Sequence, residues 1–139
     1  MKAVLDTVVF LRALMNRQGP WGHLLFDLRR QYTLVLSPDV IEEVVEVLNR
    51  SGLARRLPPA GDVQWNEVID ILADADIVQP SVKLLVSRDI ADNKFFECAV
   101  EGRADYIISE DADILDIGEF QGVQTVTAAQ FIELLESVR

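Results

Sequence analysis

The chain has 139 residues, half of them apolar, which is typical of one globular domain and argues against a disordered chain. The formal net charge is −10, from 23 acidic and 13 basic residues, so the basic excess that is usual for nucleic-acid-binding proteins is absent. The sequence shows no apolar run long enough to span a bilayer and no signal-peptide pattern, and it has one cysteine. We therefore expect a cytoplasmic protein without a membrane partner. Its length predicts a single domain over residues 1–139.

The first part of the chain predicts two short buried strands, each leading into helical sequence. Residues 2–6 (KAVLD) and 33–37 (TLVLS) are short apolar runs of the kind found in fully covered strands. A helical region between them is interrupted by glycine and proline. The second strand leads into a helix at 37–50, where Ser37 is suited to cap the helix and Pro38 to occupy its first position.

The rest of the chain continues the alternation of helices and strands. Residues 51–62 predict a break with at most one short helical turn, because this stretch is rich in glycine and proline. The later elements are expected as helices at 63–75, 91–104 and 127–138 and strands at 76–80, 105–109 and 122–126. Thr127 and Gln130 have the spacing of a capping box for the last helix.

Short apolar strands alternating with helices are typical of a mainly parallel sheet covered by helices on both faces. The expected fold class is therefore α/β, with a central sheet of four to five strands. In such sheets, ligands bind at the edge where the carboxyl ends of the strands meet. Residues that follow different strands are thus expected to lie near one another in space.

Acidic residues recur at this expected edge. They follow strands or begin helices at Asp6, Asp89, Asp92 and Asp111, and in the first turns of the helix at 37–50 at Glu42, Glu43 and Glu46. Crowded carboxylates repel one another unless a cation neutralises them, and ligand sets made only of oxygen suit Mg²⁺ or Mn²⁺. With one histidine and one cysteine, a zinc site built from these residues is disfavoured.

Each acid also has an ordinary structural interpretation. Asp6, Asp89 and Asp92 can be helix N-caps, Asp111 can occupy a turn, and two of the three glutamates are expected to be solvated helix surface. Taken singly, these interpretations are the simpler ones. The coincidence of several acids at one edge of the sheet is what favours a site.

Four stretches of the sequence resemble the PIN domain family, of the kind found as the toxin of toxin–antitoxin modules (VapC-like). AVLDTVVFLRAL at 3–14 resembles the opening strand of the family, and LSPDVIEEVVEVLNR at 36–50 resembles its second block. RDIADNKFFECAVEGRADYIISEDADIL at 88–115 resembles the third and most specific block, and GVQTVTAAQFIELL at 122–135 resembles the last strand and helix.

This resemblance implies a three-layer α/β/α sandwich and a Mg²⁺- or Mn²⁺-dependent endoribonuclease. It also implies RNA as the substrate, a cognate antitoxin protein as a partner, and a homodimer. Carried over by position, the catalytic and metal-binding acids are Asp6, Glu43, Asp92 and Asp111. The auxiliary candidates around them are Thr7, Asp89, Asn93, Ser109 and Asp113.

Two positions depart from the family pattern. Val8 stands where the family usually has asparagine, and Glu110 stands where a small residue usually precedes the last acid. The alternative to an active ribonuclease is therefore a catalytically weak or inactive PIN-like module that binds RNA or a partner. A phosphoryl-accepting domain is disfavoured, because phosphatases of that kind need a second aspartate at the place of Val8, and receiver domains need a lysine after a late strand.

Overall fold

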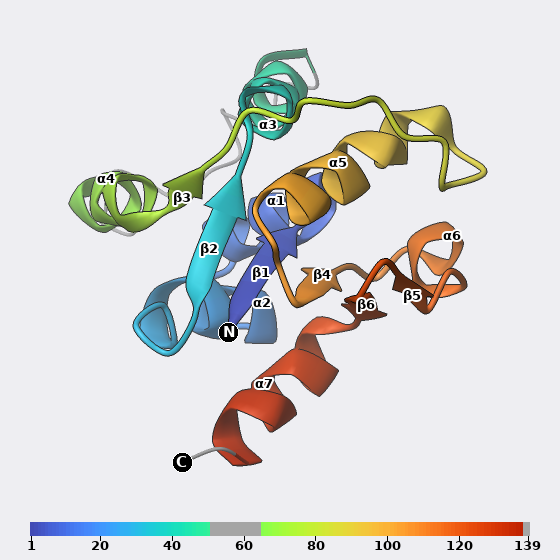
Figure 1. The fold of residues 1–139 in the computed structure, drawn as a ribbon. Coiled ribbons are helices and arrows are strands. Elements are labelled where there is room, and N and C mark those ends of the chain that lie inside the picture. Colours follow the sequence, from blue (N-terminus) through green and yellow to red (C-terminus); the bar gives the residue numbers. More distant parts are fainter. Residues whose placement is uncertain (51–64, 138–139) are drawn as a thin grey trace.

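Six strands form one mostly parallel sheet in the order β3-β2-β1-β4-β6-β5 (Figure 1). The computed structural model describes residues 1–50 and 65–137, so the break predicted at 51–62 lies outside the described residues. The strands are β1 (Lys2–Leu5), β2 (Thr33–Leu36), β3 (Asp76–Ile77), β4 (Tyr106–Ile108), β5 (Glu119–Phe120) and β6 (Val123–Val126). All neighbouring pairs run parallel except β5 and β6.

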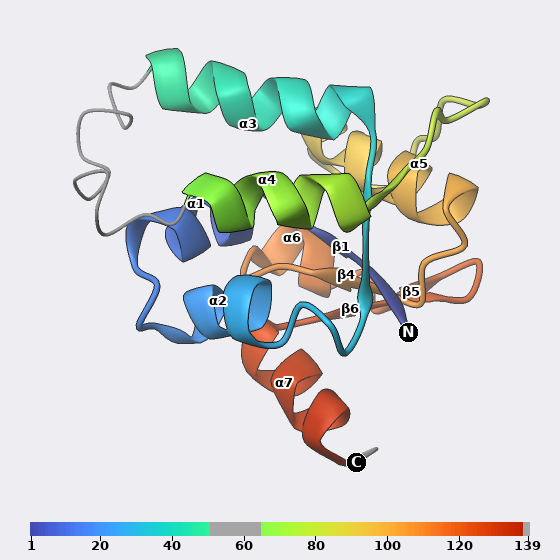
Figure 2. The ribbon, with the colours of Figure 1, turned by 90° about the vertical axis from the view of Figure 1, so that its left-hand side faces the viewer.

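Helices connect the strands and lie on both sides of the sheet, which confirms the three-layer α/β/α class (Figures 1 and 2). They are α1 (Thr7–Met15), α2 (Pro20–Gly22), η1 (His23–Asp27, a π-helix), α3 (Pro38–Arg50), α4 (Trp65–Asp74), η3 (Ile90–Asp92, a 3₁₀ helix), α5 (Asn93–Glu101), α6 (Ala112–Leu115) and α7 (Ala128–Ser137). In Figure 1, α5 lies in front of the sheet and α1 behind it. None of the described helices is both long and apolar enough to cross a membrane.

The local signals in the sequence act as expected at two helix starts. Ser37 Oγ accepts a hydrogen bond from the amide of Val40 at 3.3 Å, so Ser37 caps α3. Thr127 and Gln130 form the predicted reciprocal capping box, with hydrogen bonds of 2.9 and 3.1 Å at the start of α7. Each cap satisfies amides that the first turn of a helix leaves without an intrahelical partner.

The predicted count of four to five strands is too low by one. The missed strand, β5, has two residues and pairs antiparallel with β6, with Phe120 opposite Val123. The connection contains Gln121 and Gly122, both with positive φ, yet it lacks the Asn-Gly or Asp-Gly pair that marks a tight hairpin. The short helix α6 was missed as well, because four residues give no readable periodicity.

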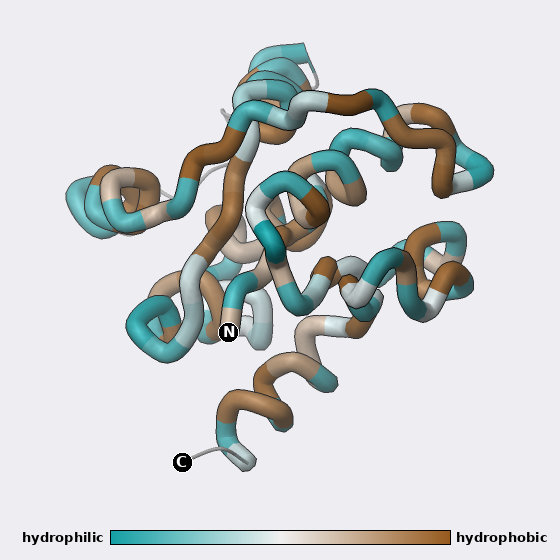
Figure 3. The backbone as a smooth tube through the Cα atoms, in the orientation of Figure 1, coloured by the Kyte–Doolittle hydropathy of each residue, from teal (hydrophilic) through white to brown (hydrophobic). Residues whose placement is uncertain are grey.

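The central strands form the core on which the site is built. Figure 3 shows β2 as a hydrophobic run, as expected for a strand covered on both faces. β1 lies between β2 and β4, and the backbone ladder continues past its end: the amide of Asp6 donates to the carbonyl of Ile108 at 3.0 Å. The residues that follow β1 and β4 are thereby fixed side by side at one edge of the sheet.

Candidate functional site

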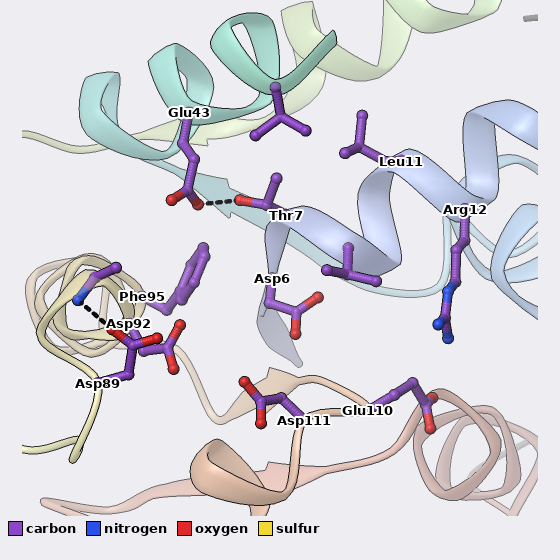
Figure 4. A pocket seen from close by; sticks show the side chains of 13 residues that line it. Asp6, Thr7, Leu11, Arg12, Glu43, Asp89, Asp92, Phe95, Glu110 and Asp111 are labelled. Carbon is purple, nitrogen blue, oxygen red and sulfur yellow. Dashed lines mark hydrogen bonds between the residues drawn. The ribbon is translucent and has the colours of Figure 1, made fainter. Parts of the chain in front are cut away.

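An acidic pocket of about 400 Å³ lies where β1 and β4 end (Figure 4). Six carboxylates belong to its lining: Asp6, Glu43, Asp89, Asp92, Glu110 and Asp111. They come from the residues after β1 and β4, from α3, and from the segment that begins α5. The structure thus brings the four principal predicted acids to one pocket, although they are far apart in sequence.

Asp6 is both a helix cap and a wall of this pocket. Its Oδ1 accepts from the amide of Val9 at 2.8 Å, which caps α1, and its Oδ2 accepts from the hydroxyl of Ser109. Burial raises the pKa of Asp6; the two hydrogen bonds lower it, and the nearby charges of Asp111 and Glu110 raise it further. The structural and the functional interpretations of this residue are therefore compatible.

Ser109 connects Asp6 to Asp111. While its hydroxyl donates to Asp6, the same oxygen accepts from the amide of Asp111 at 2.9 Å. Asp111 in turn caps α6, because its Oδ1 accepts from the amide of Asp113 at 3.0 Å. A fully buried serine thus fixes the relative position of two acids that follow neighbouring strands.

Among the pocket acids, Asp92 has the side chain that contributes least to holding the fold together. It stands at the N-cap position of α5 but makes no side-chain capping bond, and the capping role predicted for this region falls to Asp89, which caps η3. The Oδ2 atom of Asp92 is buried and has no hydrogen-bond partner among the described residues. Burial, together with the charges of Asp89, Asp111, Asp6 and Glu43, raises the pKa of Asp92 to about 6.

Glu43 is held on both of its oxygens. Oε2 accepts from the hydroxyl of Thr7, and Oε1 pairs with Nζ of Lys94 at 2.8 Å. The other two glutamates of α3, Glu42 and Glu46, are exposed, as the sequence predicted for two of the three. Glu43 thus enters the pocket already neutralised by a cation, unlike Asp92.

Three of the auxiliary candidates, Ser109, Asn93 and Asp113, lie outside the pocket lining. Ser109 is the one whose hydroxyl contacts two of the pocket acids, and the other two have different partners. Asn93 is buried, and its Oδ1 accepts from the amides of Val86 and Ser87 at 2.9 and 2.8 Å, which holds the segment before α5. Asp113 pairs with Arg88 at 2.8 Å on the surface. The geometry therefore gives both residues structural contacts away from the pocket.

The two departures from the family pattern both line the pocket. Val8 is 49% exposed, so its placement beside the acids is confirmed and a core position is excluded. Oε1 of Glu110 accepts from the amide of Ala128 at 3.1 Å and from Nε1 of Trp21 at 3.4 Å. The carboxylate of Glu110 is thereby tied to the start of α7 rather than left free in the pocket.

Arg12 also belongs to the lining, and it was not among the residues predicted for the site. The sequence feature that could have identified Arg12 is its spacing from Val8. The two residues are four apart on α1, so they share a face of that helix. That face was identifiable only once Val8 was known to border the pocket.

We expect Val8→Asn to tighten Mn²⁺ binding by about tenfold, because an amide beside the acids can hold a carboxylate in its ligating rotamer. Since Val8 is half-exposed, the change should leave the melting temperature of the metal-free protein nearly unaltered. Calorimetric Mn²⁺ titration and thermal unfolding of both forms test this. Val45→Asn, at an equally exposed helical valine outside this pocket, is the control; a similar gain there would contradict the prediction.

The donor set fits a hard divalent cation. Carboxylate oxygens are the preferred ligands of Mg²⁺ and Mn²⁺, and the unpaired buried oxygen of Asp92 and the mutual repulsion of the acids are both relieved by a cation. Within residues 1–50 and 65–137, no group of three or more His, Cys, Asp and Glu side chains is arranged so that it could hold a metal ion as it stands. Binding would therefore need side-chain adjustment within the pocket.

The chain is similar to known proteins in sequence and in fold. A family model described as PIN domain matches residues 2–113. An uncharacterized protein of Methanocaldococcus jannaschii, MJ1680, is 32% identical over 123 residues, covering 84% of this chain and 75% of that protein. Among solved structures, a chain of VapBC2 from Rickettsia felis, bound to a DNA fragment from their promoter, has a TM-score of 0.56 at 14% identity, covering 91% of this chain and 98% of that one.

Proposed function

The chain belongs to the PIN domain family, and on that premise we propose that it is a Mg²⁺- or Mn²⁺-dependent endoribonuclease that hydrolyses phosphodiester bonds of RNA. The observation that carries the proposal is the pocket itself. Its carboxylates converge from four parts of the chain, and one of them, Asp92, has a buried oxygen with no partner among the described residues. A fold without a ligand gains nothing from such an arrangement, since crowded buried charges are destabilising.

In this proposal Asp6, Asp92 and Asp111 would hold the cation directly. When bound, the metal supplies charge stabilisation at the phosphate and lowers the pKa of a water nucleophile. Ser109 keeps Asp6 and Asp111 in register through its two hydrogen bonds. We assign Asp92 as the carboxylate that would take the proton of the water.

Glu43 has a different role in the proposal. Both of its oxygens are engaged, by Thr7 and by Lys94, so we assign it to contact the metal through water rather than directly. The Lys94 ammonium lowers the repulsion that a further bare carboxylate would add. Thr7 and Lys94 thereby position Glu43 from two sides.

The structural relative adds a biological context to the proposal. That relative is part of VapBC2, whose crystal structure has it bound to a DNA fragment from their promoter. We propose by analogy that the present chain is the toxin of a toxin–antitoxin pair, with a cognate antitoxin and a second copy of itself as protein partners. Co-purification with the product of a neighbouring small gene, followed by mass measurement of the complex, tests this part.

Metal-dependent cleavage of single-stranded RNA tests the catalytic part. We expect the wild type to cleave with Mn²⁺ and to stop with EDTA. Asp6→Asn should lose roughly 100-fold or more in rate, since it removes a ligand charge while keeping an oxygen for the amide of Val9. Asp27→Asn, at an exposed acid outside the pocket, is the control. RNA binding without turnover in the wild type would instead support the non-cutting binding module, which the replacement of the usual asparagine by Val8 favours.

A further inference from the structure

Among the described residues that line the acidic pocket, Arg12 is the one that carries a positive charge. It lies over the ring of Trp21, with Cζ 4.9 Å from the ring centroid. No ion pair joins it to a carboxylate in the described part of the chain. Among the other described arginines, Arg17, Arg50 and Arg88 are in ion pairs, and Arg29, Arg30 and Arg103 are not but lie outside the lining of this pocket. An exposed guanidinium that stays unpaired beside six carboxylates needs an explanation.

The contacts of Glu110 supply it. Glu110 is connected to Arg12 through Trp21. Oε1 of Glu110 accepts a hydrogen bond from Nε1 of Trp21, and Arg12 lies over the ring of the same residue. That oxygen also accepts from the amide of Ala128 at the start of α7, where the positive end of the helix favours a negative charge. Glu110 is therefore held by Trp21 and α7, and the donors of Arg12 stay available.

The Trp21 ring also restricts where those donors lie, because Cζ of Arg12 stays over the ring. The five N–H groups of a guanidinium lie in its plane and form a rigid fork, which suits a planar, two-pronged contact. Phosphate and carboxylate are the groups that fit this fork. Holding the long side chain against Trp21 also reduces the rotamer entropy that is lost on binding.

The position of Arg12 selects between these ligands. Figure 4 shows Arg12 on the side of the pocket where Glu110 lies, and Glu43, Asp89 and Asp92 on the opposite side, with Asp6 and Asp111 between them. A nucleic-acid strand whose scissile phosphate lies at Asp6, Asp92 and Asp111 would extend toward Arg12. A pocket lined by six acids otherwise repels a polyanion, so its one cation has a large effect on where the strand binds.

We propose that Arg12, held over the ring of Trp21, binds the phosphate next to the scissile one in single-stranded RNA and so sets the register of the strand in the pocket. The inference rests on the proposed ribonuclease function and adds to it a subsite that needs no metal contact. Arg12 is then a substrate-binding residue, and its loss should raise KM more than it lowers kcat.

The test compares Arg12→Gln, Arg12→Lys and the wild type in binding a fluorescein-labelled single-stranded RNA of about ten nucleotides. Ca²⁺ replaces Mg²⁺, and the intactness of the probe is checked on a gel. For Arg12→Gln we expect a roughly tenfold higher Kd. The slope of log K against log[salt] should be smaller in magnitude by up to about 0.7, which is the value of one phosphate contact on a single strand. Arg12→Lys should recover the slope but only part of the affinity, because lysine lacks the planar fork.

Arg30→Gln is the control for charge alone, because Arg30 is exposed just before β2, at the opposite ends of the strands. It should match the wild type in Kd and slope. Mn²⁺ affinity should not fall in any of the variants, whereas a general disturbance of the pocket would lower it. Equal Kd and slope for Arg12→Gln and the wild type would overturn the inference. The guanidinium of Arg12 would then be expected to bind a carboxylate of a protein partner instead. A wild type that neither binds nor cleaves RNA would overturn the proposed function as well, so the two failures are distinguishable.

Discussion

Asp92→Asn should abolish metal-dependent RNA cleavage and, at the same time, stabilise the metal-free protein at neutral pH. The loss follows from removing the charge of a proposed metal ligand and proton acceptor. The gain follows because the wild-type carboxylate has a buried, unpaired oxygen and faces four other acids. A shift of the pKa from 3.8 to about 6 corresponds to about 3 kcal/mol, which solvent at the exposed side of this half-buried residue reduces to about 1–2 kcal/mol.

The pH dependence has a definite sign. Folding raises the pKa of Asp92, so between pH 3.8 and about 6 the folded state binds more protons than the unfolded state. The negative charge of Asp92 therefore destabilises the folded state by its full amount above about pH 6, and this penalty disappears as the pH falls toward 3.8. The difference in unfolding free energy between Asp92→Asn and the wild type should be largest at pH 7.5 and nearly absent at pH 4.

Urea unfolding in EDTA at several pH values measures this difference. Asp70→Asn, at an exposed acid of α4, controls for the general benefit of reducing a net charge of −10. It should give no comparable gain at any pH. An Asp92→Asn protein that is less stable than the wild type at pH 7.5 would show that the carboxylate has a stabilising partner, and it would remove the argument that this pocket awaits a cation.

Sequence alone was sufficient to locate Asp6 and Asp111. Both follow apolar strands, and parallel strands that are neighbours in a sheet bring the residues after them together, as the bond from the Asp6 amide to the Ile108 carbonyl shows. The same holds for the caps at Ser37 and Thr127, since a cap depends on residues within one turn. These features were predictable because each depends on a few adjacent residues or on the rule for parallel sheets.

Other features depend on contacts that spacing does not encode. The choice of Glu43 over its neighbours in α3 depends on where Thr7 and Lys94 lie, and those residues come from two other helices. The stacking of Arg12 on Trp21 joins two helices across a turn, and no periodicity predicts it. Likewise β5 exists because Phe120 can pair with Val123, although two residues show no strand pattern. The roles of the acids as metal ligands stay a prediction.

A divalent cation should raise the melting temperature of the wild type by roughly 10 °C when it is present at about 100 times its Kd. The folded state alone assembles the pocket, so binding stabilises it by about 2.7 kcal/mol at that concentration, and a domain of this size gains a few degrees per kcal/mol. Thermal unfolding with increasing Mn²⁺ measures the shift.

Asp111→Asn should reduce this shift to half or less, and Asp113→Asn should leave it unchanged. The two substitutions remove the same charge two residues apart, but Asp111 lines the pocket and Asp113 pairs with Arg88 outside it. A loss of about 10–100-fold in affinity at Asp111 leaves the metal at only about 1–10 times its Kd, which lowers the stabilisation to about 0.4–1.4 kcal/mol. Asn retains an oxygen for the amide of Asp113, so α6 stays capped and the metal-free fold is preserved. Equal shifts in melting temperature in the two variants would mean that the cation binds elsewhere on this acidic surface, and the proposed metal site in the pocket would be wrong.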